Sequence, residues 1–199
     1  MIDKFLKAKH WQLFLSVFGI PMLLQLIFMG IIFIGINSED GPNLPLLFNY
    51  IRIFPVISIL FISLFFGWFW SIGVGLDKKI PEDLKLNLGR FKLFLIIPFL
   101  YYILVLLFIS IAFPAMITMI GIPTGTIMSI ILPIHFFAMF CMFHSLYFVA
   151  KTIKIAELKR KVTFGDFAGE FFLLWFFPIG VWIVQPKINK MIIQENEYL

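Results

Sequence analysis

The chain of 199 residues is poor in charge and nearly devoid of cysteine. Charged residues make up 14% of it, against roughly 25% in soluble globular proteins. The single cysteine, Cys141, excludes an internal disulfide framework and a cysteine-rich zinc site. Apolar residues reach 61%, and the mean hydropathy is +1.01. Because a soluble domain of this size cannot bury so much apolar surface, the composition predicts an integral membrane protein.

Recognisable enzyme motifs are absent as well. The sequence contains no HExxH, no nucleophile elbow, no P-loop and no dinucleotide-binding glycine fingerprint, so we expect neither an enzyme nor a cofactor. Ionisable groups are scarce inside the apolar segments, where only His135 and His144 titrate and Gln25 adds an amide. Ion-coupled transporters use more intramembrane polar groups than this, which weakens that functional class.

Four apolar runs are long enough to cross a bilayer as helices, which takes about 20 residues each. They cover about residues 12–36, 54–75, 93–113 and 127–150. Residues 37–42 carry a strong loop signal, and Pro114 with residues 121–125 predicts an uncharged hairpin. Pro81 with two acids behind it predicts a helix start. We therefore predict an all-α integral membrane helical bundle that forms one domain over residues 1–199.

A fifth apolar segment, residues 164–185, follows the last of these runs. Thr163 and Asp166 have the spacing of a capping box at its start. Pro178 and Gly180 interrupt it and predict a helix break. Its uncharged stretch, residues 171–184, is shorter than the roughly 30 Å hydrocarbon core requires. The segment is either a fifth span or a re-entrant or interfacial segment, and the sequence leaves both open.

Basic residues alternate between the two sides of the expected bundle. Three lie before the first span (Lys4, Lys7 and Lys9), five in residues 76–92 and five in residues 151–170. Residues 37–50 and 114–126 have none. The positive-inside rule then predicts a cytoplasmic N-terminus. The same basic loops are expected to contact anionic lipid headgroups, so we expect the lipid bilayer as the partner and no nucleic acid.

Small residues recur at every fourth position of the second span, namely Ser63, Gly67, Ser71 and Gly75. Residues four apart share one helix face, and small side chains let another backbone approach closely. This small-residue stripe predicts a helix-packing face. Its partner is either another subunit, in a complex or homo-oligomer, or a neighbouring span of the same chain.

One set of soft ligands stands out in the fourth span. His135, Met139 and Met142 fall on one helix face, and such ligands suit Cu(I). Methionine is also a common filler of apolar gaps, and a buried neutral histidine often bonds to a neighbouring helix. The sequence therefore names a candidate metal site with a packing alternative.

Asp166 and Glu170 lie four residues apart at the start of the fifth segment. Such a pair can bind a cation or act as an acid and base. The three basic residues just before it, at 159–161, favour an interfacial charge cluster instead.

Two stretches carry a resemblance, WSIGVGLDKKIP at 70–81 and GEFFLLWFFPIGVWIVQPKINK at 169–190. They resemble a group of small, uncharacterised multi-pass inner-membrane proteins of bacteria. The resemblance implies a bacterial cytoplasmic membrane, and it assigns no activity and no catalytic residue.

Two functional hypotheses follow. The first is a non-enzymatic accessory or scaffold protein that acts through helix–helix association, motivated by the small-residue stripe and the basic loops. The second is a small transporter or permeability protein for a lipid or another apolar solute. Its motivation is the interruption at Pro178 and Gly180, because discontinuous helices often frame binding sites in membrane proteins.

Overall fold

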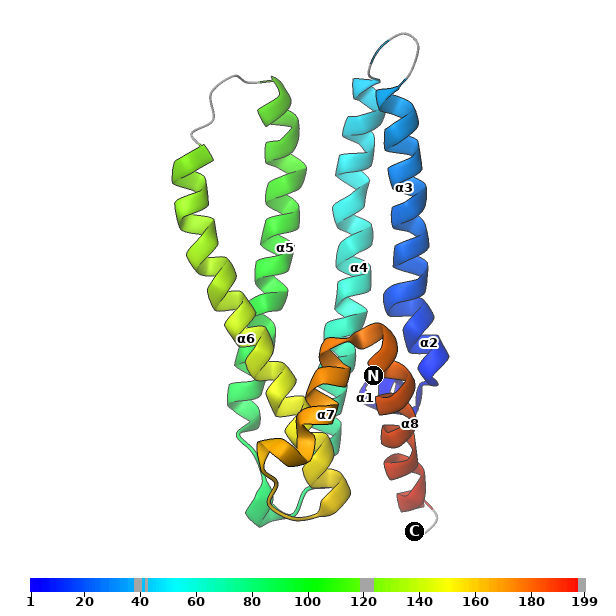
Figure 1. Ribbon diagram of the computed structural model, residues 1–199, viewed down its shortest axis with the longest axis vertical. Coiled ribbons are helices and arrows are strands. Elements are labelled where there is room, and N and C mark those ends of the chain that lie inside the picture. Colours follow the sequence, from blue (N-terminus) through cyan, green and yellow to red (C-terminus); the bar gives the residue numbers. More distant parts are fainter. Residues whose placement is uncertain (38–40, 42, 119–123, 197–199) are drawn as a thin grey trace.

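The computed structural model describes residues 1–37, 41, 43–118 and 124–196. Regular structure in these residues is helical throughout, which confirms the predicted all-α bundle (Figure 1). The elements are α1 (Ile2–Lys7), α2 (His10–Phe14), a π-helical turn η1 (Leu15–Gly19), α3 (Ile20–Ile36), α4 (Leu44–Asp77), a 3₁₀ turn η2 (Glu82–Leu84), α5 (Leu88–Thr118), α6 (Thr124–Leu158), α7 (Phe164–Trp175) and α8 (Phe177–Asn196).

Four helical stretches among the described residues are long and apolar enough to cross a membrane. They are His10–Ile36, Arg52–Asp77, Leu88–Ile111 and Ser129–Leu158. Each coincides with one of the four apolar runs of the sequence. Length, composition and helical structure thus agree on a membrane protein.

Two helices extend beyond the expected loop boundaries. Helix α4 already begins at Leu44, well before residue 54, where the second span was predicted to start. Proline suits the first turn of a helix because its missing N–H has no partner there, and Pro45 takes that position. Helix α5 continues past Pro114 to Thr118. The rest of the predicted hairpin, residues 119–123, and the acids Glu39 and Asp40 lie outside the described residues.

The helix start expected at Pro81 is wrong. Only the 3₁₀ turn η2 follows that proline, and α5 begins seven residues later at Leu88. The reason is a stronger cap downstream. The Asn87 side-chain oxygen accepts a hydrogen bond of 2.9 Å from the backbone N–H of Arg90, which satisfies one of the free donors at the start of α5.

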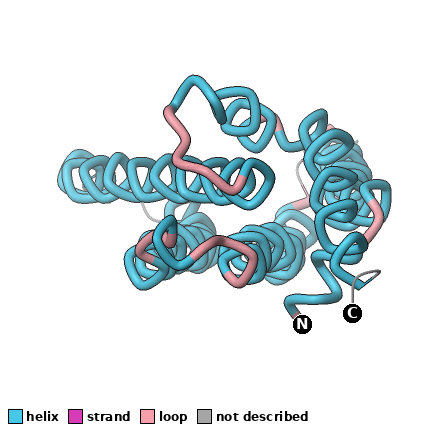
Figure 2. The backbone as a smooth tube through the Cα atoms, turned by 90° about the horizontal axis from the view of Figure 1, so that it is seen from below, coloured by secondary structure: helices cyan, strands magenta, loops and turns pink. Residues whose placement is uncertain are grey.

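Helix α4 lies at the centre of the bundle. It packs against α3 and α5, and at its lower end also against α1 and α6. Figure 1 shows an α3–α4 pair beside an α5–α6 pair, with α1, α7 and α8 gathered at one end. Seen along the bundle, α7 and α8 lie beside that end and both chain termini emerge there (Figure 2). We refer to it as the terminal end of the bundle.

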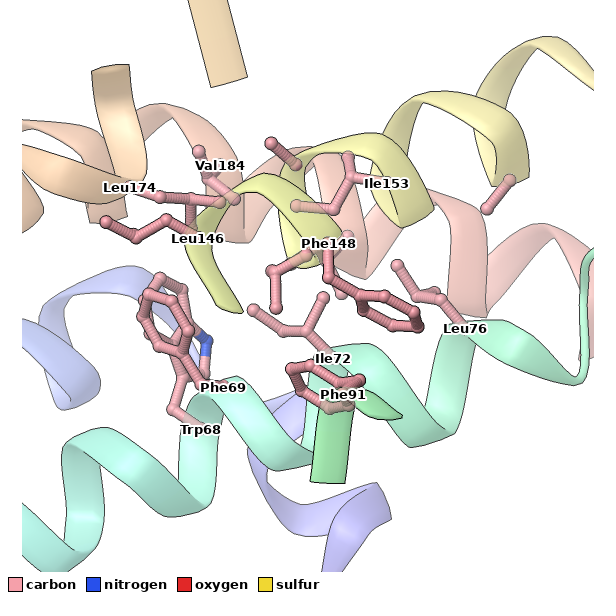
Figure 3. Close-up of a cluster of buried hydrophobic side chains, with 14 of the residues drawn as sticks. Trp68, Phe69, Ile72, Leu76, Phe91, Leu146, Phe148, Ile153, Leu174 and Val184 are labelled. Atoms are coloured by element: carbon pink, nitrogen blue, oxygen red, sulfur yellow. The ribbon is translucent and has the colours of Figure 1, made fainter. Parts of the chain in front are cut away.

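The buried core is concentrated at the terminal end (Figure 3). Phe91 of α5 and Phe148 of α6 stack with ring centroids 4.4 Å apart, next to Ile72 of α4. Gly73 makes room for this contact, since a Cβ there would lie 2.3 Å from the Phe91 ring. The other half of the spans exposes large apolar side chains, as expected for helices surrounded by lipid.

The fifth apolar segment is a helical hairpin. Helix α7 ends at Trp175, the chain turns at Phe176, and α8 returns to the terminal end. Neither helix is among the candidate spans of the described residues. Because α8 returns to the end at which α7 begins, the two ends of the described chain lie at the same end of the bundle. A re-entrant or interfacial position of this hairpin in a bilayer stays a prediction.

Candidate functional site

A mostly apolar cavity lies on the side of the bundle, at the tip of the α7–α8 hairpin. Its volume is about 370 Å³, within the size range of about 300–1,000 Å³ that is usual for ligand pockets. We call it the lateral cavity. The turn η1, helices α3 and α4, one residue of α5 and the hairpin tip line it, through Val17, Phe18, Pro21, Leu24, Gln25, Phe28, Phe54, Ile57, Ser58, Phe61, Ile62, Phe65, Tyr102, Phe177 and Pro178.

The wide turn η1 forms one wall of the lateral cavity. Pro21 lacks an N–H, and its ring would clash with the carbonyl of Val17 in a regular α-helix. The chain avoids the clash with a π-helical turn, in which the N–H of Ile20 donates to the carbonyl of Leu15. Such single π-turns occur frequently at functional sites. Here the turn places Val17 and Phe18 against the cavity.

Three polar side chains face the otherwise apolar lateral cavity. They are Gln25 of α3, Ser58 of α4 and Tyr102 of α5. The hydroxyl of Tyr102 lies within hydrogen-bonding reach of that of Ser58. The amide of Gln25 has no hydrogen-bond partner among the described residues. A mostly apolar pocket with a few convergent polar groups is the usual arrangement of a ligand site.

The hairpin tip closes the lateral cavity from the terminal end. The Phe177 ring lies 5.5 Å from that of Phe65 and 5.3 Å from that of Trp68, both on α4. Phe65 is twelve residues from the end of α4 at Asp77, which corresponds to about 18 Å of helix. The hairpin therefore reaches roughly to the middle of the second span.

Pro178 and Gly180 have separate roles in this hairpin. The break itself falls at Phe176, two residues before Pro178, which occupies the first turn of α8. Gly180 lies against the backbone of α7, where a Cβ would come within 1.6 Å of the Leu173 carbonyl oxygen. Only glycine permits the two helices to turn back this closely.

Charged residues anchor the base of the hairpin to α6. Lys187 of α8 contacts Glu170 at 2.6 Å and Glu157 of α6 at 2.7 Å, while Lys154 contacts the same carboxylates at 3.2 and 3.1 Å. We call these four residues the charge cluster. Burial alone raises the pKa of Glu170, but hydrogen bonds from Lys187, the backbone and Lys154 outweigh it and lower the pKa.

Asp166 has a different role from Glu170. It completes the capping box with Thr163, whose backbone N–H and hydroxyl donate to its carboxylate at 2.7 and 2.9 Å. Together with Arg160, which donates at 2.9 Å, these bonds lower the pKa of Asp166 to about 2. The two acids thus bind separate partners, in keeping with a cluster of interfacial charges.

The N-terminal helix α1 packs on the small-residue stripe of α4. A Cβ on Gly67 would lie 3.2 Å from the Phe5 ring, and one on Gly75 would lie 2.4 Å from Leu6. The hydroxyls of Ser63 and Ser71 donate to carbonyls one turn earlier in α4. Within this chain the stripe therefore faces α1, which the sequence did not identify as its partner.

The candidate metal ligands contact different neighbours. His135 Nδ1 and the Tyr101 hydroxyl are hydrogen-bonded at 3.0 Å. Met139 and Met142 instead line a small cavity of about 180 Å³ beside Trp175 of α7. Metal binding by these residues stays a prediction.

The sequence pointed to Gln25 as a polar residue within a span, but it did not point to Ser58 or Tyr102. The available signal was a polar residue within an apolar run, although only the tertiary fold brings these residues together. Comparison with known proteins finds no matching family model, curated protein or solved structure. Fold and composition together define the class, an all-α membrane protein with a lateral cavity.

Proposed function

We propose that this chain is a small, non-catalytic transporter or permeability protein that binds a lipid or another apolar solute in the lateral cavity. The observation that carries the proposal is the composition of the cavity wall, which is apolar apart from three neutral polar groups. Lipid-facing cavities between membrane helices exchange ligands with the bilayer without exposing them to water.

The hairpin supports the same function. Its tip forms part of the cavity wall through Phe177 and Pro178, while the charge cluster holds its base on α6. Interrupted helices of this kind commonly frame substrate sites in transporters.

Association as an accessory or scaffold subunit is the alternative. The small-residue stripe motivated it, but α1 covers Gly67 and Gly75 of that stripe. Binding a membrane-protein partner or a second copy through this face therefore requires α1 to leave. We favour the cavity-based function for this reason.

We further propose a multi-pass protein of a bacterial cytoplasmic membrane with both termini cytoplasmic. The basic loops support this orientation through the positive-inside rule. At the terminal end three lysines and one acid line a cavity of about 730 Å³, namely Lys7, Lys78, Lys79 and Asp3. The net positive charge of this lining suits anionic lipid headgroups. Reporter fusions at either terminus test the orientation, and activity of a periplasmic reporter at the C-terminus contradicts it.

A filling substitution tests ligand binding. Leu24→Trp places a larger side chain in the lateral cavity, whereas Leu23→Trp changes a neighbouring residue of α3 that is 61% exposed and does not line it. We expect Leu24→Trp to remove co-purifying lipid and to stop exchange of a fluorescent lipid between vesicles, with Leu23→Trp unaffected. Equal lipid content and equal exchange in both variants would falsify the proposal.

A further inference from the structure

The side chain of Gln25 is a polar group without a partner in an apolar setting. Gln25 is an exposed residue of α3 that lines the lateral cavity, and its amide makes no hydrogen bond with the described residues. An amide left without hydrogen bonds in an apolar medium costs several kcal/mol, and lipid tails offer none. The amide is therefore poised to pair with a group of the molecule that fills the cavity.

The opposite walls supply two further groups of the same kind. Ser58 and Tyr102 carry neutral hydroxyls, and each can bond to a ligand, since a hydroxyl has one donor and two acceptor sites. None of the described residues that line the cavity is charged. A charged headgroup there would have no counter-charge, at a large desolvation cost.

The position of these three polar groups within the membrane further restricts the chemical class of the ligand. Each group lies well inside its span, counted from the span end that is remote from the chain termini. Gln25 is 11 residues from Ile36, Ser58 is six from Arg52, and Tyr102 is nine from Ile111. This is about 9–17 Å of helix. The polar interfacial region is only about 5–8 Å thick on each side of a bilayer, so phospholipid headgroups do not reach this level.

We infer that the lateral cavity binds an uncharged lipid whose apolar chain carries a carbonyl or hydroxyl group, and that Gln25 pairs with this group inside the membrane. The inference rests on the proposed function and adds its substrate class. Phenylalanine side chains from η1, α3, α4 and α8 surround the apolar part, and the amide recognises the single polar group by donating or accepting one hydrogen bond.

Photoaffinity labelling tests the inference on the full-length protein in phosphatidylcholine vesicles. Three diazirine probes with the same C16 chain end in a hydroxyl, a methyl or a phosphate group. We expect the alcohol probe to label peptides that contain Phe28 or Phe54 at least fivefold more than the other two. Gln25→Leu should abolish this preference, because it removes one hydrogen bond at nearly constant volume. Met22→Leu, a change at an exposed residue of α3 outside the cavity, should retain it.

The outcomes separate the inference from the proposed function. Equal labelling by the alcohol and methyl probes, or an unchanged preference in Gln25→Leu, overturns the inference and leaves a cavity for purely apolar solutes. Labelling by the phosphate probe as strong as by the alcohol overturns the uncharged class. No labelling of the cavity peptides by any probe overturns the proposed function as well.

Discussion

Trp68 and Gln185 form a fully buried hydrogen-bonded pair between α4 and α8. The indole Nε1 of Trp68 donates to the Gln185 Oε1 at 2.8 Å. The Nε2 of the same amide donates to the carbonyls of Phe5 and Ala8 at 3.0 and 2.9 Å. These carbonyls lie at the end of α1, where a helix leaves its last acceptors unpaired. Gln185 therefore joins α1 to α4 and α8, and it shares the capping of α1 with Asn189, whose Nδ2 donates to the Leu6 carbonyl at 2.7 Å.

Replacement of Gln185 by leucine should destabilise the protein strongly. The variant leaves the buried Trp68 N–H without a partner, at a cost of about 1–3 kcal/mol in the free energy of unfolding. It also removes two hydrogen bonds to α1, although the Ala8 carbonyl keeps Asn189 and the Phe5 carbonyl keeps the N–H of Ala8 as donors. Trp68→Phe removes only one donor and should cost less. Denaturant titration in mild detergent, followed by circular dichroism, measures both. A Gln185→Leu protein as stable as the wild type would show that the pair contributes nothing.

Two glycines of the hairpin give a matched comparison. Gly180→Ala places a methyl group 1.6 Å from the Leu173 carbonyl oxygen, so the hairpin must open and α8 must move. Gly169→Ala in α7 meets no atom within 4 Å and should be neutral or stabilise by up to about 1 kcal/mol, because alanine favours helix more than glycine. Thermal unfolding in detergent should show a much lower midpoint for Gly180→Ala alone. Equal unfolding midpoints for the two variants would contradict the close contact between Gly180 and the backbone of α7.

Local patterns account for what the sequence predicted correctly. Four runs of more than 20 apolar residues have few alternatives to membrane helices, and the capping box at Thr163 depends on residues three apart. Both features are decided within a short stretch of chain. The hairpin form of the fifth segment was not predicted, since Pro178 and Gly180 indicate a break but not the direction of the chain after it.

Contacts between distant segments account for what the sequence did not predict. The stripe on α4 is visible as a repeat of four residues, but its partner α1 is a short helix that precedes the first span. Its position depends on Gln185, 180 residues away from Phe5. The lateral cavity likewise requires Gln25, Ser58 and Tyr102 to meet from three helices. The residue pattern within one helix does not show which residues of other helices it will contact.

Enlarging the small-residue stripe should displace α1. In Gly75→Leu the new side chain overlaps Leu6, since even a Cβ would lie 2.4 Å from it. We expect α1 to detach, so that a cysteine introduced as Ala8→Cys reacts with a water-soluble maleimide several-fold faster. Gly30→Leu in α3, where the Cβ meets nothing within 4 Å, is the control with unchanged reactivity. A slow reaction in both variants would place α1 elsewhere than on the stripe.

The charge cluster predicts a dependence of stability on acid. Because the pKa of Glu170 in the folded protein lies below its ordinary value of 4.5, its ionised form stabilises the fold. This contribution is complete above about pH 4.5 and is lost as the pH falls through the lower folded-state pKa. Stability should therefore decline on acidification, as the hairpin base loses its contacts with Lys187 and Lys154.

Glu170→Gln separates this contribution from those of other acids. The variant should be less stable at pH 7 by about 1–3 kcal/mol, because two lysines lose a partly buried partner. It should also lose less stability than the wild type between pH 5 and pH 3.5. Glu82→Gln, which changes an exposed carboxylate on η2, should follow the wild-type profile, since exposed ion pairs contribute little. Unfolding midpoints measured across this range decide the matter. Parallel profiles for the wild type and Glu170→Gln would assign the acid sensitivity to other groups and leave Glu170 with no pH-dependent role in holding the hairpin.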